Sequence, residues 1–393
     1  MPNLKAIGQY THGPILIIVA VFPASLAYAL LTAVMALRLE RDGIPPWLIG
    51  VNTAVFPLAI LVTSQMIPWL IRRCNSGILI LAGMAMAGAG SILMGYYHSY
   101  TAWCLLRFGV GVGVAVLWLV AEAWLHAIVP EHSRGRYHAW YAVSLAVGFA
   151  LGPQIVNLSG IDGLAPFTLT AAIGMAAGFA FFSMRVAAPQ MILTSVWAMR
   201  PLLTKAPLAM GLALIGGGIE TALFGLAPLF TIDIGLTVAG TLSLISAFAI
   251  GHILLQPPLA LLIDHISEKR MMIILTLSAA VMAILLPFFA GTVLLWPMVV
   301  IWGGLVYGFY NLGIASLSHR FSPSELIKAH SVFVISYQMG GILGPLAVGT
   351  TITLWGGMAL PFSLASLALS VPCGIWILVG LQRWFRINQE HKK

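Results

Sequence analysis

The residues most able to do chemistry are ionisable side chains that stand inside long apolar stretches of the sequence. Glu220 follows Gly216-Gly217-Gly218, and His252 lies one helical turn before Gln256. If these stretches cross a bilayer, each charged group costs about 2.5–3.5 kcal/mol on insertion scales, and such residues commonly serve a function. We predict that Glu220 carries an exchangeable proton and that His252 tunes or shares it. The alternative is a protonated, hydrogen-bonded Glu220 and a neutral packing His252.

Arg107 and Glu122 stand in one further apolar stretch. A guanidinium group keeps its proton in proteins, so Arg107 can act only through its charge. Arg107 would lower the pKa of a nearby carboxylate or bind an anionic group, and we place it with Glu220 and His252 in a proton-coupling set. The alternative is that Arg107 pairs with backbone carbonyls. Glu122 lies near the end of the stretch, and we predict a structural role for it with Arg134 and Arg136 as its partners.

The sequence contains none of the motifs that we would expect of an enzyme, a nucleotide site or a metal site. It contains no His-Glu-x-x-His pair, no Walker-type glycine loop and no Gly-x-Ser-x-Gly elbow. Its 3 cysteines show no metal-site or disulfide spacing. We therefore predict no enzyme, no cofactor and no metal site. Without a nucleotide site, energy must come from an ion gradient; protons are favoured, and sodium is the alternative, although sodium would call for clustered carboxylates and carbonyls.

The elements that must position these residues are helices in a membrane. Hydrophobic residues make up 60% of the chain and charged residues 8%, with a mean hydropathy of +0.99, whereas a soluble domain carries about 25% charged residues. A stretch of about 20 apolar residues crosses a hydrocarbon core as a helix. We predict twelve spans, at roughly 13–37, 46–71, 77–97, 101–127, 137–158, 166–186, 207–232, 237–263, 271–290, 293–318, 328–352 and 360–382.

The positive charges assign the sides of the membrane. When the loops are placed alternately, nearly all Lys and Arg residues fall on one side, and the other side receives only Arg38 and Arg41. This is the positive-inside pattern. We predict a multi-pass protein of the cytoplasmic (inner) membrane with both termini in the cytoplasm. The net charge of +8 thus reflects topology, and we expect no nucleic-acid partner.

The two halves of the chain resemble one another. The segment Gly148-x-x-x-Gly152-Pro153 recurs as Gly340-x-x-x-Gly344-Pro345, 192 positions later. A duplicated unit of six helices gives repeats related by an axis along the membrane normal. We predict an all-α polytopic membrane protein of two pseudo-symmetric bundles: six helices in 1–190, a cytoplasmic central loop in 191–206 and six helices in 207–393.

These motifs resemble those of the major facilitator superfamily. Gly148, Gly152 and Pro153 on the fifth span are similar to the antiporter motif of its exporters, in which small residues permit close helix approach and proline permits a bend. Arg107-x-x-x-Gly111 resembles the family's motif on the fourth span. The segment from Trp118 to Glu122, with Arg134-Gly135-Arg136 and Gln256-Pro257, resembles the YcaD-type branch. The resemblance implies the major facilitator fold and a transporter of the exporter type.

The family's loop motif is present in only one half. Asp264 with Lys269-Arg270 resembles it in the second half, whereas Arg72 stands at the aspartate position in the first. By pseudo-symmetry we expect a cytoplasmic latch in which Asp264 lies near Arg134 and Arg136, and Arg72 lies near Glu325. The predicted conformational residues are therefore Gly148, Gly152, Pro153, Gly340, Gly344, Pro345, Asp264, Arg72, Glu122 and Arg136.

Between the halves we expect a cavity with an amphipathic lining and few charges. Such a lining suits a moderately hydrophobic or weakly charged small molecule better than a sugar phosphate, which calls for several cations. Any single aromatic residue there could instead serve packing. The predicted lining residues are Tyr28, Asn52, Trp118, Gln154, Gln256, Tyr307, Asn311 and Tyr337.

The sequence thus predicts a proton-coupled secondary transporter, an efflux antiporter that works by alternating access between two six-helix halves. Two alternatives stay open: a proton-driven importer of a small metabolite, and a non-transporting membrane protein such as an assembly factor or lipid-modifying protein. The expected partners are a small-molecule substrate, protons and the lipid bilayer, and we expect a monomer. Nothing in the sequence names the substrate.

Overall fold

A computed structural model describes residues 13–130, 133–184, 202 and 204–390. These residues form twelve long α-helices and no strand, and eleven of the helices are long and apolar enough to cross a membrane. The last helix carries a shorter apolar part, Ala359–Gly374. Most of the predicted central loop 191–206, and the first residues of the chain, lie outside the described residues. The helices of the first half are α1 (Gly13–Arg41), α2 (Pro46–Arg73), α3 (Ser76–Tyr96), α4 (Tyr100–Ile128), α5 (Arg134–Ser159) and α6 (Ala165–Ser183).

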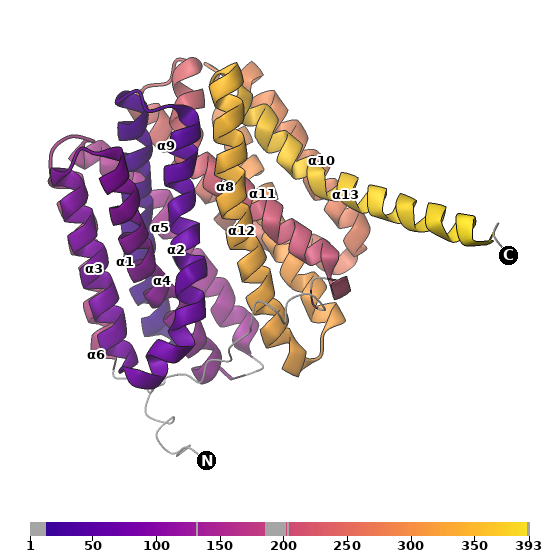
Figure 1. The fold of residues 1–393 in the computed structure, drawn as a ribbon, viewed down its shortest axis with the longest axis horizontal. Helices are drawn as coiled ribbons and strands as arrows, with labels where there is room; N and C mark the ends of the chain where they lie inside the picture. The colour runs from indigo at the N-terminus through magenta and orange to yellow at the C-terminus, as the bar shows by residue number, and fades with distance from the viewer. Residues whose placement is uncertain (1–12, 131–132, 185–201, 203, 391–393) are drawn as a thin grey trace, which may run out of the picture.

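The second half repeats this series. A 3-10 turn, Leu286–Phe289, follows its third helix. The first half lies on one side of Figure 1, in indigo and purple, and the second half lies beside it in pink to yellow. The helices of the second half are α8 (Pro207–Asp233), α9 (Val238–His265), α10 (Glu268–Leu285), α11 (Leu295–Arg320), α12 (Pro323–Trp355) and α13 (Ala359–Glu390).

Short polar residues begin several of these helices. Asn75 accepts hydrogen bonds from the backbone N–H groups of Gly77 and Ile78 and so caps α3. Ser322 and Glu325 form a capping box at the start of α12. Because these groups satisfy backbone donors at the ends of the spans, the polar loops stay short and the helices begin at defined residues.

The two bundles use the same set of helix pairs. In the first half α1 packs on α5, α2 on α4 and α3 on α6; in the second half α8 packs on α12, α9 on α11 and α10 on α13. Between the halves, α5 packs on α9 and α2 on α12, which are again equivalent pairs. The predicted fold class, twelve helices in two pseudo-symmetric bundles, is confirmed.

The repeated glycines lie where helices approach most closely. A Cβ at Gly148 would overlap Ser25 and Leu26 of α1, and a Cβ at Gly340 would overlap the backbone of Leu214 on α8. Gly344 faces the backbone of Gly218 in the same manner. Since any side chain would separate these helices, the Gly-x-x-x-Gly segments explain the tight α1–α5 and α8–α12 packing.

On the side away from the N-terminus, the halves are joined by backbone packing and polar contacts. A Cβ at Gly50 on α2 would overlap the carbonyl group of Pro345 on α12. The Trp47 backbone N–H donates to Thr353 Oγ1 at 3.0 Å. Pro345 thus serves a contact between the bundles in addition to the bend that its motif predicts.

Candidate proton and substrate site

Glu220 is the middle residue of α8, and it accepts a hydrogen bond from the Tyr337 hydroxyl group on α12. Both side chains are partly exposed although they lie midway along their helices. The glycines before Glu220 make this contact possible, because a Cβ at Gly217 would overlap the Tyr337 carbonyl group. The local sequence therefore brings α12 close enough for a phenol to reach the carboxyl group.

His252 on α9 lies at the other end of a row of tyrosines. Its ring stacks on Tyr307 with centroids 4.7 Å apart, Tyr307 stacks on Tyr310 at 5.7 Å, and Tyr310 meets Tyr337 edge-on at 5.5 Å. His252 is 2% exposed, and its Nε2 atom has no hydrogen-bond partner among the described residues. The predicted Glu220 and His252 thus belong to one cluster of aromatic and titratable groups, linked through tyrosines of α11 and α12.

Arg107 lies apart from this cluster, in the first bundle. Its side chain is 3% exposed, and its Nη1 atom donates to Asn52 Oδ1 of α2 at 3.0 Å. Asn52 Nδ2 in turn donates to Cys104 Sγ at 3.4 Å. No ion pair of the described residues includes Arg107, so it does not pair with Glu220, and its partner is an amide oxygen in place of a backbone carbonyl.

A cluster of aromatic rings connects the two bundles. Tyr28 packs on Phe56 at 4.1 Å and on Trp118 at 5.6 Å, and both Tyr28 and Trp118 also contact Phe149. Phe149 then meets Phe224 of α8 at 6.0 Å, across the boundary between the halves. The sequence analysis missed Phe56, Phe149 and Phe224 because a phenylalanine carries no distinctive signal within an apolar helix.

Of the other predicted lining residues, one joins the two halves and two have partly exposed side chains. Gln154 lies in the contact between halves, where its Nε2 atom donates to Ser246 Oγ of α9 at 2.8 Å. Gln256 and Asn311 are partly exposed. Trp118 Nε1 and Asn311 Nδ2 are buried donors for which the described part of the chain supplies no hydrogen-bond partner. These unpaired donors, with His252 Nε2, are available to polar groups of a bound molecule.

The structure gives Glu122 a partner that the sequence did not predict. Its carboxylate lies 3.9 Å from His330 Nε2 on α12 and so bridges the two halves. Arg136 is exposed and lies against its neighbour Tyr137, with 5.9 Å from its guanidinium carbon to the ring centroid; the side chain of Arg134 is outside the described residues. The pairing could not be read from the chain because the two residues are far apart in sequence and lie on helices of different bundles.

The predicted latch is also different. Glu325 pairs with Lys205 at 3.2 Å, while Arg72 Nε donates to Pro68 O of its own helix at 3.0 Å. The Ser322 backbone and hydroxyl groups, followed by Lys205, donate to Glu325 and hold the pKa of its carboxyl below the ordinary value. Asp264 is exposed, and the described residues provide it with no ion pair. The local cap satisfies Glu325, so the Arg72–Glu325 pair is not formed.

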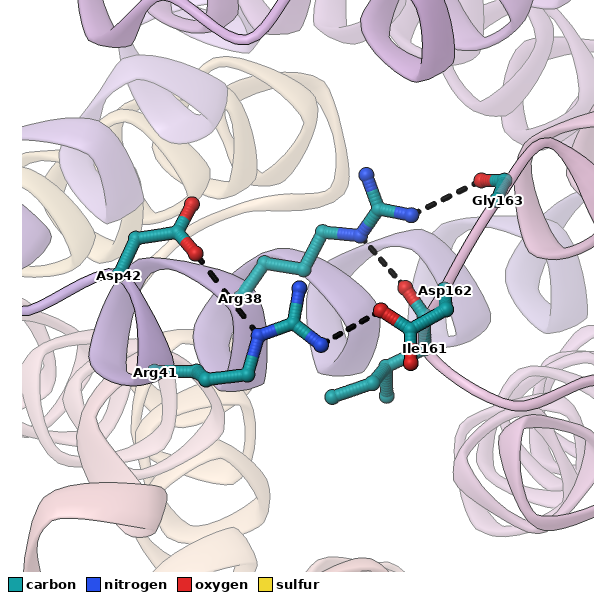
Figure 2. A network of polar contacts seen from close by, with 6 residues as sticks. All are labelled: Arg38, Arg41, Asp42, Ile161, Asp162 and Gly163. Carbon is teal, nitrogen blue, oxygen red and sulfur yellow. Dashed lines mark hydrogen bonds and ion pairs between the residues drawn. The ribbon is translucent and has the colours of Figure 1, made fainter.

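A further polar network joins α1 to the loop between α5 and α6 (Figure 2). Arg38 is 3% exposed; its Nε donates to Ile161 O at 2.5 Å and its Nη2 to Gly163 O at 2.8 Å. Arg41 Nη1 lies 2.5 Å from Asp162 Oδ1 and lowers the pKa of that carboxyl. The sequence analysis used these arginines only as markers of topology; their partners lie more than a hundred positions away.

Family comparison agrees with this architecture. The sequence model of the Major Facilitator Superfamily matches residues 17–311 and, in a second overlapping match, residues 208–393. The chain belongs to this superfamily. The predicted membership is confirmed, and this major facilitator protein is a multi-pass secondary transporter and not an enzyme.

Curated relatives support the predicted branch. This major facilitator chain is 24% identical over 343 residues to the uncharacterized MFS-type transporter YfkF of Bacillus subtilis, which covers 85% of this chain and 87% of YfkF. It is 24% identical over 341 residues to the uncharacterized MFS-type transporter YcaD of Escherichia fergusonii, covering 86% of this chain and 88% of YcaD.

Solved structures share its fold. The nucleoside transporter NupG superposes with a TM-score of 0.74 at 13% identity, over 94% of this chain and 99% of NupG. A bacterial homolog of the human lysosomal transporter Spinster, in an inward-facing and unoccupied conformation, superposes with a TM-score of 0.69 at 14% identity, over 96% of each chain. Identities this low establish the fold alone.

Proposed function

We propose that this protein is a proton-coupled efflux antiporter of the inner membrane and that Glu220 carries the coupled proton. The observation that supports the proposal is the hydrogen bond between Glu220 and Tyr337 at the middle of α8 and α12. It places a titratable, partly exposed group on the helix pair that also carries Gly340 and Gly344. A proton at this position acts directly on the packing of two helices.

Protonation changes the strength of that bond. A hydrogen bond to an ionised group contributes about 1.5–3 kcal/mol, and a neutral one about 0.5–1.5 kcal/mol. A difference of about 1 kcal/mol shifts a two-state equilibrium about fivefold. Because α12 packs on both α8 and α2, a change at Tyr337 reaches the contact between the bundles. Proton binding at Glu220 therefore biases alternating access.

The direction and orientation rest on sequence motifs. The Gly-x-x-x-Gly-Pro segments resemble those of exporters, and the charge pattern assigns the termini to the cytoplasm. A cysteine introduced at Asn388 should resist an impermeant thiol reagent added from the periplasmic side. Labelling of that cysteine from the periplasm would reverse the assigned orientation.

Transport is tested in proteoliposomes. A thermal-shift screen of metabolites and amphiphilic drugs selects a ligand as the transport probe, because a ligand of the folded state raises its apparent stability. Wild-type protein should move this probe uphill, against the proton flux, under an imposed pH gradient. Glu220→Gln should lose uphill transport and keep exchange between equal concentrations. Asp233→Asn, which removes an exposed carboxylate at the end of the same helix, is the matched control.

Three results would contradict the proposal. Normal uphill transport by Glu220→Gln would remove Glu220 from the coupling. Flux of the probe in the same direction as the protons would identify an importer. A folded protein whose ligand causes no proton movement would favour the non-transporting alternative.

A further inference from the structure

Arg107 is a buried cation that forms no ion pair with any of the residues that the structure describes. We propose that Arg107, positioned by Asn52, binds the anionic group of the substrate and that this substrate is a monocarboxylate with an aromatic or apolar body. The inference rests on the proposed transport function and adds the class of molecule that the site would take.

The first argument is the count of donors at Arg107. A guanidinium group has five N–H donors and keeps its charge in a protein. Within the described part of the chain Arg107 forms one hydrogen bond, from Nη1 to Asn52 Oδ1, and an amide oxygen carries no net charge. Burial of an unpaired charge is costly. A carboxylate offers two acceptor oxygens in the geometry that an arginine matches and would supply the missing charge.

Arg38 provides a comparison within the same chain. Both arginines are 3% exposed. Arg38 donates to two backbone carbonyls and lies over the Phe167 ring at 4.6 Å, so protein groups occupy its surroundings. Arg107 has a single amide partner. Arg38 is therefore a structural arginine, whereas Arg107 has further N–H donors that a ligand could accept from.

The second argument is the position of Arg107 beside the aromatic cluster. Arg107 and Trp118 are separated by about three turns of α4 and therefore share one face of that helix. Tyr28, which packs edge-on against Trp118, also packs on Phe56 of α2 with ring centroids 4.1 Å apart. Gly111 lies against Phe56 and Ala59, and this close α2–α4 packing brings Asn52 to Arg107.

These neighbours define the class of ligand. Tyr28, Trp118 and Phe149 are partly exposed and offer ring surfaces to an apolar body, while Trp118 Nε1 is a donor without a partner. A single arginine balances one negative charge, whereas a phosphate calls for several cations.

The test uses the full-length purified protein and two pairs of matched probes. Indole-3-acetate is compared with indole-3-acetamide, and phenylacetate with phenylacetamide, by thermal shift and by calorimetry. The acids should stabilise the wild type and bind at least tenfold more tightly than the amides. Arg107→Gln should abolish this preference. Arg38→Gln, the matched control, should lower the melting temperature but keep the preference for the acids.

Arg107→Lys keeps the charge and removes the paired donors, so it should bind the acids several-fold more weakly than the wild type. This variant keeps the proposal testable if Arg107→Gln does not fold. Equal binding of acids and amides, unchanged affinity in Arg107→Lys, or a preference for acids that survives in Arg107→Gln would overturn the proposal. Equal stabilisation by sodium chloride would assign the site to an inorganic anion and would also overturn it.

Failure of this inference is distinguishable from failure of the proposed function. If acids bind through Arg107 but Glu220→Gln transports them uphill as the wild type does, the carboxylate subsite stands and the coupling assignment fails. If Glu220-dependent transport is found for a neutral probe and no acid binds, the coupling stands and the subsite fails.

Discussion

Loss of the contact between Glu122 and His330 should open the side of the protein that carries the N-terminus. The two residues belong to α4 and α12, and so to different bundles. The imidazole bears a charge only when it is protonated. Glu122→Gln removes the carboxylate charge at nearly constant size, so the expected effect is a change in population with the fold retained.

The structure limits the size of this effect. The atoms lie 3.9 Å apart, and each side chain is 29% exposed. A solvated ion pair of this kind contributes less than about 1 kcal/mol. The ratio of the two conformations should therefore change by no more than about fivefold.

Distances between spin labels provide the assay. Cys74, an exposed native cysteine after α2, and a cysteine at the exposed Lys269 of α10 would carry the labels, with the other native cysteines replaced. Glu122→Gln should increase the share of long distances.

Arg72→Ala is the matched control, because the Arg72 side chain bonds to a carbonyl of its own helix. It should leave the distances unchanged. The reasoning is refuted if Arg72→Ala and Glu122→Gln shift the distances equally, or if neither variant shifts them. The first result would restore the latch predicted from the sequence, and the second would show that the Glu122–His330 contact does not hold the two bundles together.

Two further predictions concern stability. Arg38→Gln should lower the free energy of unfolding by about 2–4 kcal/mol, since it removes two charge-assisted hydrogen bonds from a buried group, whereas Arg41→Gln should cost little because its pair with Asp162 is exposed. Because Arg41 lowers the pKa of Asp162, the contribution of the Arg41–Asp162 pair to stability is present at neutral pH and is lost as the pH falls through the lowered pKa. Melting temperatures measured at successively lower pH should show this loss in the wild type. Arg41→Gln should not show it. Gly344→Ala should lower the free energy of unfolding by about 1–3 kcal/mol through overlap with the α8 backbone. Gly109→Ala, where a Cβ meets nothing within 4 Å, should be neutral or slightly stabilising; equal losses in the two glycine variants would contradict the close-packing argument.

Much of the fold was predictable from the chain alone. The length and spacing of the apolar stretches define the spans, because the hydrocarbon thickness sets how many residues a helix needs to cross it. The repeated Gly-x-x-x-Gly-Pro segments identified the two halves, and the structure places Gly148 and Gly340 at equivalent helix contacts. Such features depend on local composition and on short-range spacing, which are visible in one sequence.

The ionisable residues themselves were also visible, since each is rare in an apolar stretch. Glu220, His252 and Arg107 were found in this manner. Their grouping was not predictable. Glu220 and His252 share a row of tyrosines, whereas Arg107 lies in the other bundle with Asn52. Helical periodicity tells which residues share a face of one helix but does not tell which helix that face meets.

The sequence by itself determined the class of the protein, its spans, its two halves and the residues able to carry charge within the membrane. The tertiary structure alone decided the partners of those residues: Glu122 with His330, Glu325 with Lys205, and Arg38 with the α5–α6 loop. The physical reason is that a partner depends on the rotation and contact of helices distant in sequence. Those are set by the summed packing of both bundles, and no local pattern contains that sum.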